Sequence, residues 1–151
     1  MKITHLRYFV LALCLLPALL WAESREEAQA LAQKAALYVE QNGLDAAREA
    51  FHDKNGEFIK GSLYVFVQQL DGTMLIHGVV PKLENTNHYN LRDPKGTYFV
   101  REMAKVVQGP TGTGWVDYMW KHPKTGKFTP KTTYVQKLKG MDTYVGCGVF
   151  L

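Results

Sequence analysis

The fold class is decided by residues 63–77, which read LYVFVQQLDGTMLIH. Residues 63–67 are β-branched and aromatic, and this composition predicts a strand. The pair Asp71-Gly72 is typical of a hairpin turn, and residues 73–77 predict the returning strand. The sequence therefore predicts an antiparallel β-hairpin, and the remaining elements are best understood as additions on either side of it.

A long helix is predicted before the hairpin. Ser24 and Glu27 have the spacing of a capping box, which predicts a helix over residues 24–42. Apolar side chains recur at helical intervals inside it, at Ala28, Leu31, Ala35 and Tyr38. The pair Asn42-Gly43 predicts the end of this helix, and a short second helix fits residues 44–51.

Three further strands are predicted after the hairpin, at residues 114–121, 128–138 and 143–150. Loops are expected at residues 52–61 and 79–96, and a helix at residues 98–108. Short connections between consecutive strands favour antiparallel pairing. We therefore expect an α+β domain with a five-stranded antiparallel sheet, a crossover made of a loop and a helix, and helices covering one face of the sheet.

Residues 1–22 predict a secretory signal peptide. Lys2 and Arg7 precede an apolar run at residues 8–20, and the small residue Ala22 follows where a peptidase would cut. The run has 13 residues, against the roughly 20 that span a bilayer. We expect cleavage, a single domain over residues 23–151 and a periplasmic location; an uncleaved segment that anchors the chain to the inner membrane is the alternative.

The charge of the chain excludes one class of partner. The net charge of +4 falls to +2 once Lys2 and Arg7 leave with residues 1–22. Such a mild charge gives no reason to expect nucleic acid, which requires a concentrated basic surface. Cys147 is the one cysteine left after cleavage, so no internal disulfide is expected, and its strand-like surroundings favour a buried apolar role.

A search for catalytic patterns finds none. The sequence has no nucleophile elbow, no zinc-protease motif and no phosphate-binding glycine loop. The histidines after residue 22 do not stand at metal-ligand spacing with one another or with cysteine. We therefore expect a non-catalytic protein with no cofactor and no metal site.

The positive signal is for binding. Val116, Tyr118 and Trp120 alternate along one strand and so share one of its faces. Gly146 and Gly148 share a face of the last strand, where they leave a hollow that suits either a ligand or close helix packing.

Cationic side chains stand near these aromatic residues in the sequence. Lys131, Arg101 and His77 together with aromatic rings suit a short carboxylate, because the cations bind its oxygens and the rings take its apolar tail. Each residue also has a structural interpretation. Arg101 and Lys131 fit solvated surface positions, Tyr118 and Trp120 fit the core, and His77 fits a hydrogen-bonded structural histidine.

Several motifs, in order, resemble single Cache domains of the second type. They are YVFV (64–67), LDGTMLIH (70–77), PKL (81–83), YFVREM (98–103), GWVDYMW (114–120), PKTTYV (130–135) and VGCGVF (145–150). The resemblance covers about residues 28–151. It implies a PAS-like fold with a long N-terminal helix and a five-stranded antiparallel sheet, here as a stand-alone exported domain.

The resemblance also implies extracytoplasmic sensing of small ligands, often short organic acids, as in chemoreceptors and histidine kinases. Carried over by position, the pocket is lined by Tyr64, Phe66, His77, Arg101, Trp115, Tyr118, Trp120, Lys131 and Tyr134. We therefore expect a periplasmic sensory module for a short carboxylate. The alternative is an interaction module that docks on a membrane-bound sensor kinase or chemoreceptor and has no ligand of its own. The two differ in whether a cavity of a few hundred Å³ is present.

Overall fold

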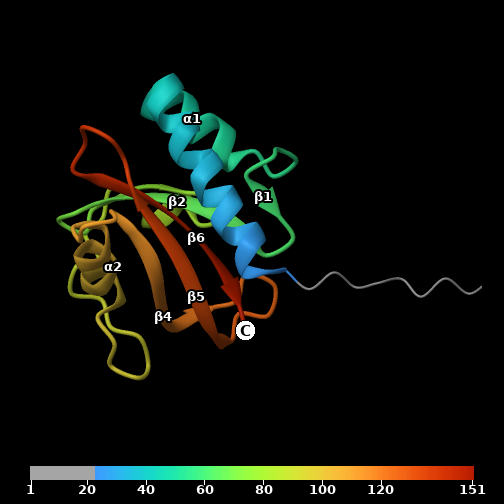
Figure 1. Ribbon diagram of the computed structural model, residues 1–151. Coiled ribbons are helices and arrows are strands. Elements are labelled where there is room, and N and C mark those ends of the chain that lie inside the picture. The colour runs from blue at the N-terminus through green and yellow to red at the C-terminus, as the bar shows by residue number, and fades with distance from the viewer. Residues whose placement is uncertain (1–22) are drawn as a thin grey trace, which may run out of the picture.

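The computed structural model describes residues 23–151, and the predicted signal peptide lies outside this range (Figure 1). Two α-helices, one short 3₁₀ helix and six strands follow one another in the order α1 (Arg25–His52), β1 (Ile59–Lys60), β2 (Leu63–Gln69), β3 (Met74–His77), η1 (Pro81–Leu83), α2 (Phe99–Val107), β4 (Thr113–Lys121), β5 (Phe128–Lys137) and β6 (Thr143–Phe150). Within residues 23–151, no helix is both long and apolar enough to cross a membrane.

The start of α1 is a complete capping box, as the sequence predicts. The Ser24 hydroxyl accepts a hydrogen bond from the backbone N–H of Glu27, and the Glu27 carboxylate accepts one from the backbone N–H of Ser24, both at 3.1 Å. Gly43 has φ of 82° and ψ of 172°, which interrupts the helical backbone. Glycine adopts positive φ without strain, so α1 consists of two helical segments that meet at the predicted position.

The sheet is antiparallel, with strand order β1-β2-β6-β5-β4, and β3 also pairs with β2. The five predicted strands are all present. The sixth, β1, has two residues that pair with the start of β2, inside the segment predicted as a loop. A two-residue strand is too short to show any periodicity in the sequence.

The two helices cover opposite faces of the sheet, so the expectation of helices on one face was wrong. Val65 of β2 and Cys147 of β6 pack in the cluster that contains α1, whereas Phe66 of β2 and Tyr144 of β6 pack in the cluster that contains α2. The reason is that β2 and β6 are buried along almost their whole length. A strand that is apolar on both faces needs cover on both.

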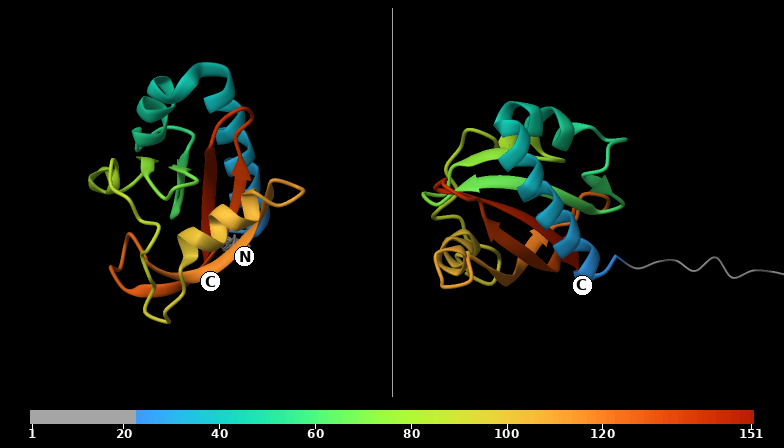
Figure 2. Two further views of the ribbon diagram at one scale, coloured as in Figure 1. Left: turned by 90° about the vertical axis from the view of Figure 1, so that its left-hand side faces the viewer. Right: turned by 45° about the horizontal axis from the view of Figure 1, so that its top comes forward.

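The crossover between β3 and α2, residues 78–98, descends beside the hairpin that joins β4 to β5 (Figure 2, left, lime to yellow beside orange). Asp93 ties these segments together. One of its carboxylate oxygens accepts the backbone N–H groups of Lys95 and Thr97 at 2.9 and 2.8 Å, and the other accepts that of Met119 at 2.8 Å. Burial opposes ionisation, but these bonds hold the pKa of Asp93 below its ordinary value.

Candidate functional site

Two adjacent cavities lie between the sheet face that α2 covers and the crossover. The inner cavity has a volume of about 20 Å³ and is lined by side chains including Phe66, Gln68, His77, Met103 and Tyr118. The outer cavity has a volume of about 470 Å³ and is lined by side chains including Val79, Val80, Leu83, Met119, Lys121 and Phe128. Tyr64, Leu91, Phe99 and Trp120 line both. The inner cavity has room for about one water molecule, and the outer one lies in the range of small-molecule sites.

Stacked aromatic rings form the wall between the sheet and α2. The rings of Phe99 and Tyr118 are nearly parallel, with centroids 4.5 Å apart, and Trp120 packs edge-on against Phe99 at 5.5 Å. The Tyr118 hydroxyl forms a hydrogen bond of 3.0 Å with the hydroxyl of Thr133 on β5. The apolar wall therefore carries a hydroxyl at its inner end.

Lys131 places a cation directly behind this wall. Its side chain is 1 % exposed, and its Nζ donates a hydrogen bond of 2.9 Å to the hydroxyl of Tyr64. Nζ also lies 4.0 Å from the ring centroid of Tyr64 and 4.6 Å from that of Phe150. Among residues 23–151, no carboxylate lies within ion-pair distance of it. Burial lowers the pKa of Lys131 to about 7.

His77, at the end of β3, is a neutral donor and acceptor beside Tyr64. Its ring is buried, with its centroid 5.0 Å from that of Tyr64. Burial and then the charge of Lys131 lower the pKa of His77 to about 3. Nδ1 accepts the backbone N–H of Val80 at 3.1 Å, so the proton of the neutral ring is on Nε2.

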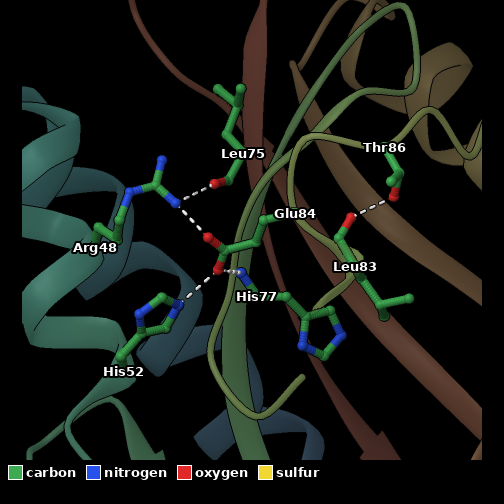
Figure 3. Close-up of polar contacts among 7 residues, drawn as sticks. All are labelled: Arg48, His52, Leu75, His77, Leu83, Glu84 and Thr86. Atoms are coloured by element: carbon green, nitrogen blue, oxygen red, sulfur yellow. Dashed lines mark hydrogen bonds and ion pairs between the residues drawn. The ribbon is translucent and has the colours of Figure 1, made fainter. Parts of the chain in front are cut away.

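The buried carboxylate of Glu84 links the residues beside the cavity to α1. Glu84, just after η1, accepts the backbone N–H of His77 at 2.8 Å and pairs with the side chains of Arg48 and His52 on α1 (Figure 3). The same Arg48 guanidinium donates to the backbone carbonyl of Leu75 at 2.7 Å. These contacts join β3, the crossover and the second segment of α1 into one connected unit.

The hollow left by the two glycines of β6 is filled by protein. A Cβ atom on Gly146 would lie 2.2 Å from the ring of Phe66, and one on Gly148 would lie 2.1 Å from the hydroxyl of Thr133 and 2.5 Å from the side chain of Lys131. The sequence left open a ligand or close helix packing, but side chains of the neighbouring strands β2 and β5 occupy this space. The glycines make room for Phe66, which lines the inner cavity, and for Lys131, which contacts the lining residue Tyr64.

The structure brings together five of the nine residues expected to line the pocket, and a sixth lies behind them. Tyr64, Phe66, His77, Tyr118 and Trp120 line the inner cavity. Lys131 contacts Tyr64 and is neither solvated nor at the cavity surface.

Three of the expected residues lie elsewhere. Trp115 and Tyr134 pack against each other at 5.4 Å on the sheet face that α1 covers. They differ by an odd number of positions from Tyr118 and Lys131 on the same strands, so alternation turns them to the opposite face. Arg101 is on the outer side of α2, where it donates to the backbone carbonyl of Tyr89 at 3.3 Å and stacks on Tyr98.

Sequence reasoning did not select seven of the residues that line the inner cavity: Gln68, Met74, His88, Leu91, Phe99, Val100 and Met103. Phe99 and Met103 are four apart on α2 and so share one face of that helix, which is the signal that could have identified them. Leu91 lies in the irregular part of the crossover, where no periodicity exists. Within residues 23–151, no group of His, Cys, Asp and Glu side chains could hold a metal ion.

An antiparallel sheet with a helix on each face, and with cavities beneath a crossover of loop and helix, is the PAS-like fold of Cache domains. The chain belongs to the single Cache domain 2 family, whose model matches residues 22–151.

Chemotaxis proteins are prominent among its relatives. The methyl-accepting chemotaxis protein McpP of Pseudomonas putida is 27 % identical over 133 residues, which are 88 % of this chain and 22 % of McpP. The chain thus spans about a fifth of the length of that relative. A solved periplasmic sensor domain of a chemotaxis protein is 26 % identical, with a TM-score of 0.66, over 83 % of this chain and 89 % of its own.

A third relative is a Cache chemosensory domain solved to explain its recognition of carboxylic acids. It is 26 % identical, with a TM-score of 0.70, over 83 % of this chain and 92 % of its own. The chain is therefore a Cache sensor domain of the type found in chemoreceptors.

Proposed function

We propose that this protein is a non-catalytic sensory module that binds a short carboxylate in the inner cavity, outside the cytoplasm. The observation that carries the proposal is the position of Lys131. This lysine is buried, has no carboxylate partner among residues 23–151, and contacts Tyr64, which lines the aromatic cavity. Keeping an ammonium group out of water is unfavourable unless an anion or strong dipoles compensate it. A bound carboxylate supplies that compensation.

The groups around Lys131 suit an anionic ligand. The Tyr64 hydroxyl accepts from Lys131 and so has its own proton free to donate toward the cavity that Tyr64 lines. The Nε2 proton of His77 and the hydroxyl of Tyr118 provide further neutral donors close by. Three donors backed by one cation match the acceptors of a carboxylate, and charge-assisted hydrogen bonds are about twice as strong as neutral ones.

A short acid needs more room than the inner cavity offers in this conformation. At about 20 Å³ the cavity has room for about one water molecule. Leu91 lines both cavities and, at 39 % exposed, is the most exposed of the four residues that they share, so it is the part of the wall that can move at least cost. We expect an incoming acid to displace the water and shift Leu91 toward the outer cavity.

Export is part of the proposal. Residues 1–22 have the features of a signal peptide, and the relative of 26 % identity described above is a periplasmic sensor domain. N-terminal sequencing of protein recovered from the periplasm should begin near Glu23. Full-length chain in the membrane fraction would instead indicate an uncleaved anchor.

A thermal-shift screen tests ligand binding. Acetate, propionate, pyruvate and lactate are compared with alcohols of matching size, and an acid at 100 times its dissociation constant should stabilise the protein by about 2.7 kcal/mol. Lys131→Met should weaken binding of the best acid by about 30-fold or more, since loss of a buried partner of a charge costs about 2–5 kcal/mol. Exposed Lys124 provides the matched control, Lys124→Met, which should bind normally.

Two outcomes would contradict the proposal. Equal affinity of the wild type and Lys131→Met would show that the lysine is structural. No response to any acid would favour the alternative, a domain that docks on a membrane sensor without its own ligand.

A further inference from the structure

The outer cavity is far larger than a short carboxylate requires. Its volume is about 470 Å³, whereas the groups that suit a short acid surround the inner cavity of about 20 Å³. A short acid held by Tyr64 and His77 would leave most of the outer cavity to water.

The walls of the outer cavity are apolar and partly open to solvent. Val79, Val80 and Leu83 line it from the crossover, and Met119 and Phe128 line it from the β4–β5 hairpin. Phe128 is 49 % exposed. Exposed apolar side chains that line a cavity are a feature of surfaces that bind a ligand or a partner.

The charged side chains around this cavity are mostly cationic. Lys82, Arg92 and Lys121 line it, and none of them forms an ion pair with another of residues 23–151. Asp93 is the single acidic side chain among the described lining residues. Its two oxygens accept three backbone N–H groups, and among residues 23–151 it forms no ion pair with these cations.

From this combination we infer a second binding site that goes beyond the proposed function. The outer cavity binds an amphipathic carboxylate whose apolar part is a medium-length alkyl chain or an aromatic ring. The alkyl chain or ring lies against Val80, Leu83 and Phe128, and the carboxylate lies at the rim near Lys82 and Lys121. A neutral apolar molecule would contact only the apolar walls, and a small hydrophilic anion would contact only the lysines at the rim. Neither would form both kinds of contact that the site offers.

The test is calorimetry with hexanoate, 1-hexanol and acetate on the purified protein. Hexanoate should bind more tightly than 1-hexanol, and its affinity should decrease with salt. Phe128→Ala should weaken hexanoate binding about tenfold, because it removes apolar area that the alkyl chain covers. The double variant Lys82→Gln/Lys121→Gln should weaken it about three- to tenfold and flatten the salt dependence.

The controls separate the two sites. Lys124→Gln/Lys127→Gln removes the same number of positive charges at exposed residues of the β4–β5 hairpin that are not among the residues lining the cavity, and it should leave hexanoate affinity unchanged. Acetate affinity should be insensitive to Phe128→Ala and to both double variants. All the substituted side chains are exposed, so the fold should be retained.

Three results would overturn the inference. The first is no binding of hexanoate, and the second is unchanged hexanoate affinity in both Phe128→Ala and the Lys82/Lys121 variant. The third is loss of hexanoate binding in Lys131→Met alone, which would place the carboxylate of hexanoate in the inner cavity. Hexanoate binding that depends on Phe128 and the rim lysines supports the inference even where acetate fails to bind. Acetate binding with no hexanoate binding leaves the proposed function intact and removes only the second site.

Discussion

Replacing Lys131 by Met should make the ligand-free protein more stable at pH 6. The lysine is buried, and burial lowers its pKa from the ordinary 10.5 to about 7. At pH 6 the charged group is therefore held in the folded state at a cost of up to about 5 kcal/mol, since each tenfold change in proton affinity corresponds to about 1.4 kcal/mol. The substitution leaves the Tyr64 hydroxyl without its donor, at a cost of about 1–3 kcal/mol. The net gain is about 2–4 kcal/mol.

The sign of this effect should reverse at high pH. Between about pH 7 and 10.5 the unfolded lysine binds a proton that the folded lysine has released, so the wild type gains stability as the pH rises. Above the unfolded pKa of 10.5 both states are neutral, and the penalty is gone. The Met variant lacks this gain. It should be the more stable protein at pH 6 and the less stable one at about pH 10.5, where only the lost hydrogen bond to Tyr64 remains.

Urea unfolding followed by tryptophan fluorescence measures the effect at pH 6, 8 and 10. Lys124→Met is the matched control: because Lys124 is exposed, its free energy of unfolding should stay within about 0.5 kcal/mol of the wild type at each pH. A Met variant that is less stable than the wild type at pH 6, with the same pH profile, would refute the reasoning. It would mean that Lys131 is well solvated or paired in the folded protein.

Three further predictions concern the same site. Affinity for a short carboxylate should fall by up to about tenfold for each pH unit above about 7, because the anion requires a protonated Lys131. Calorimetry between about pH 6 and 9 measures this change, and an affinity that does not depend on pH would exclude Lys131 as the partner of the anion. Glu84→Ala should lower the free energy of unfolding by about 2–3 kcal/mol, because partly buried Arg48 and His52 and the backbone N–H of His77 lose the buried carboxylate that they share. Glu57→Ala, at an exposed ion pair, should change it by less than about 0.5 kcal/mol in the same urea experiment. Gly146→Ala should destabilise the protein by about 1–3 kcal/mol in thermal unfolding, because its Cβ would overlap the Phe66 ring, and unchanged stability would contradict that packing.

Local patterns in the sequence predicted the elements well. The capping box at Ser24, the break at Gly43 and the turn at Asp71-Gly72 each depend on residues within a few positions, and the structure contains all three. The two-residue strand β1 escaped prediction because it exists only through its pairing with β2. The placement of α2 on the face opposite α1 was also missed, since apolar runs in β2 and β6 show that both faces are buried but not by which helix.

The candidate site was predicted less completely than the fold. Alternation along β4 correctly grouped Tyr118 with Trp120, and the same rule applied to Trp115 would have excluded it. Arg101 was a plausible cation by residue type, yet its place on α2 points it at the crossover surface. Residue type alone does not say which face of an element a neighbouring layer will cover.

By itself, then, the sequence determined the order of helices and strands, the positions of the turns and the two faces of each strand, because these follow from the helical and strand periods over a few residues. Only the tertiary structure decided which face holds the cavities and which distant groups meet there. Lys131 reaches the hydroxyl of Tyr64 across 67 positions, and Glu84 reaches Arg48 across 36. Such contacts depend on strand register and on the path of the crossover, which are set by the packing of the whole domain and leave no periodic trace in the chain.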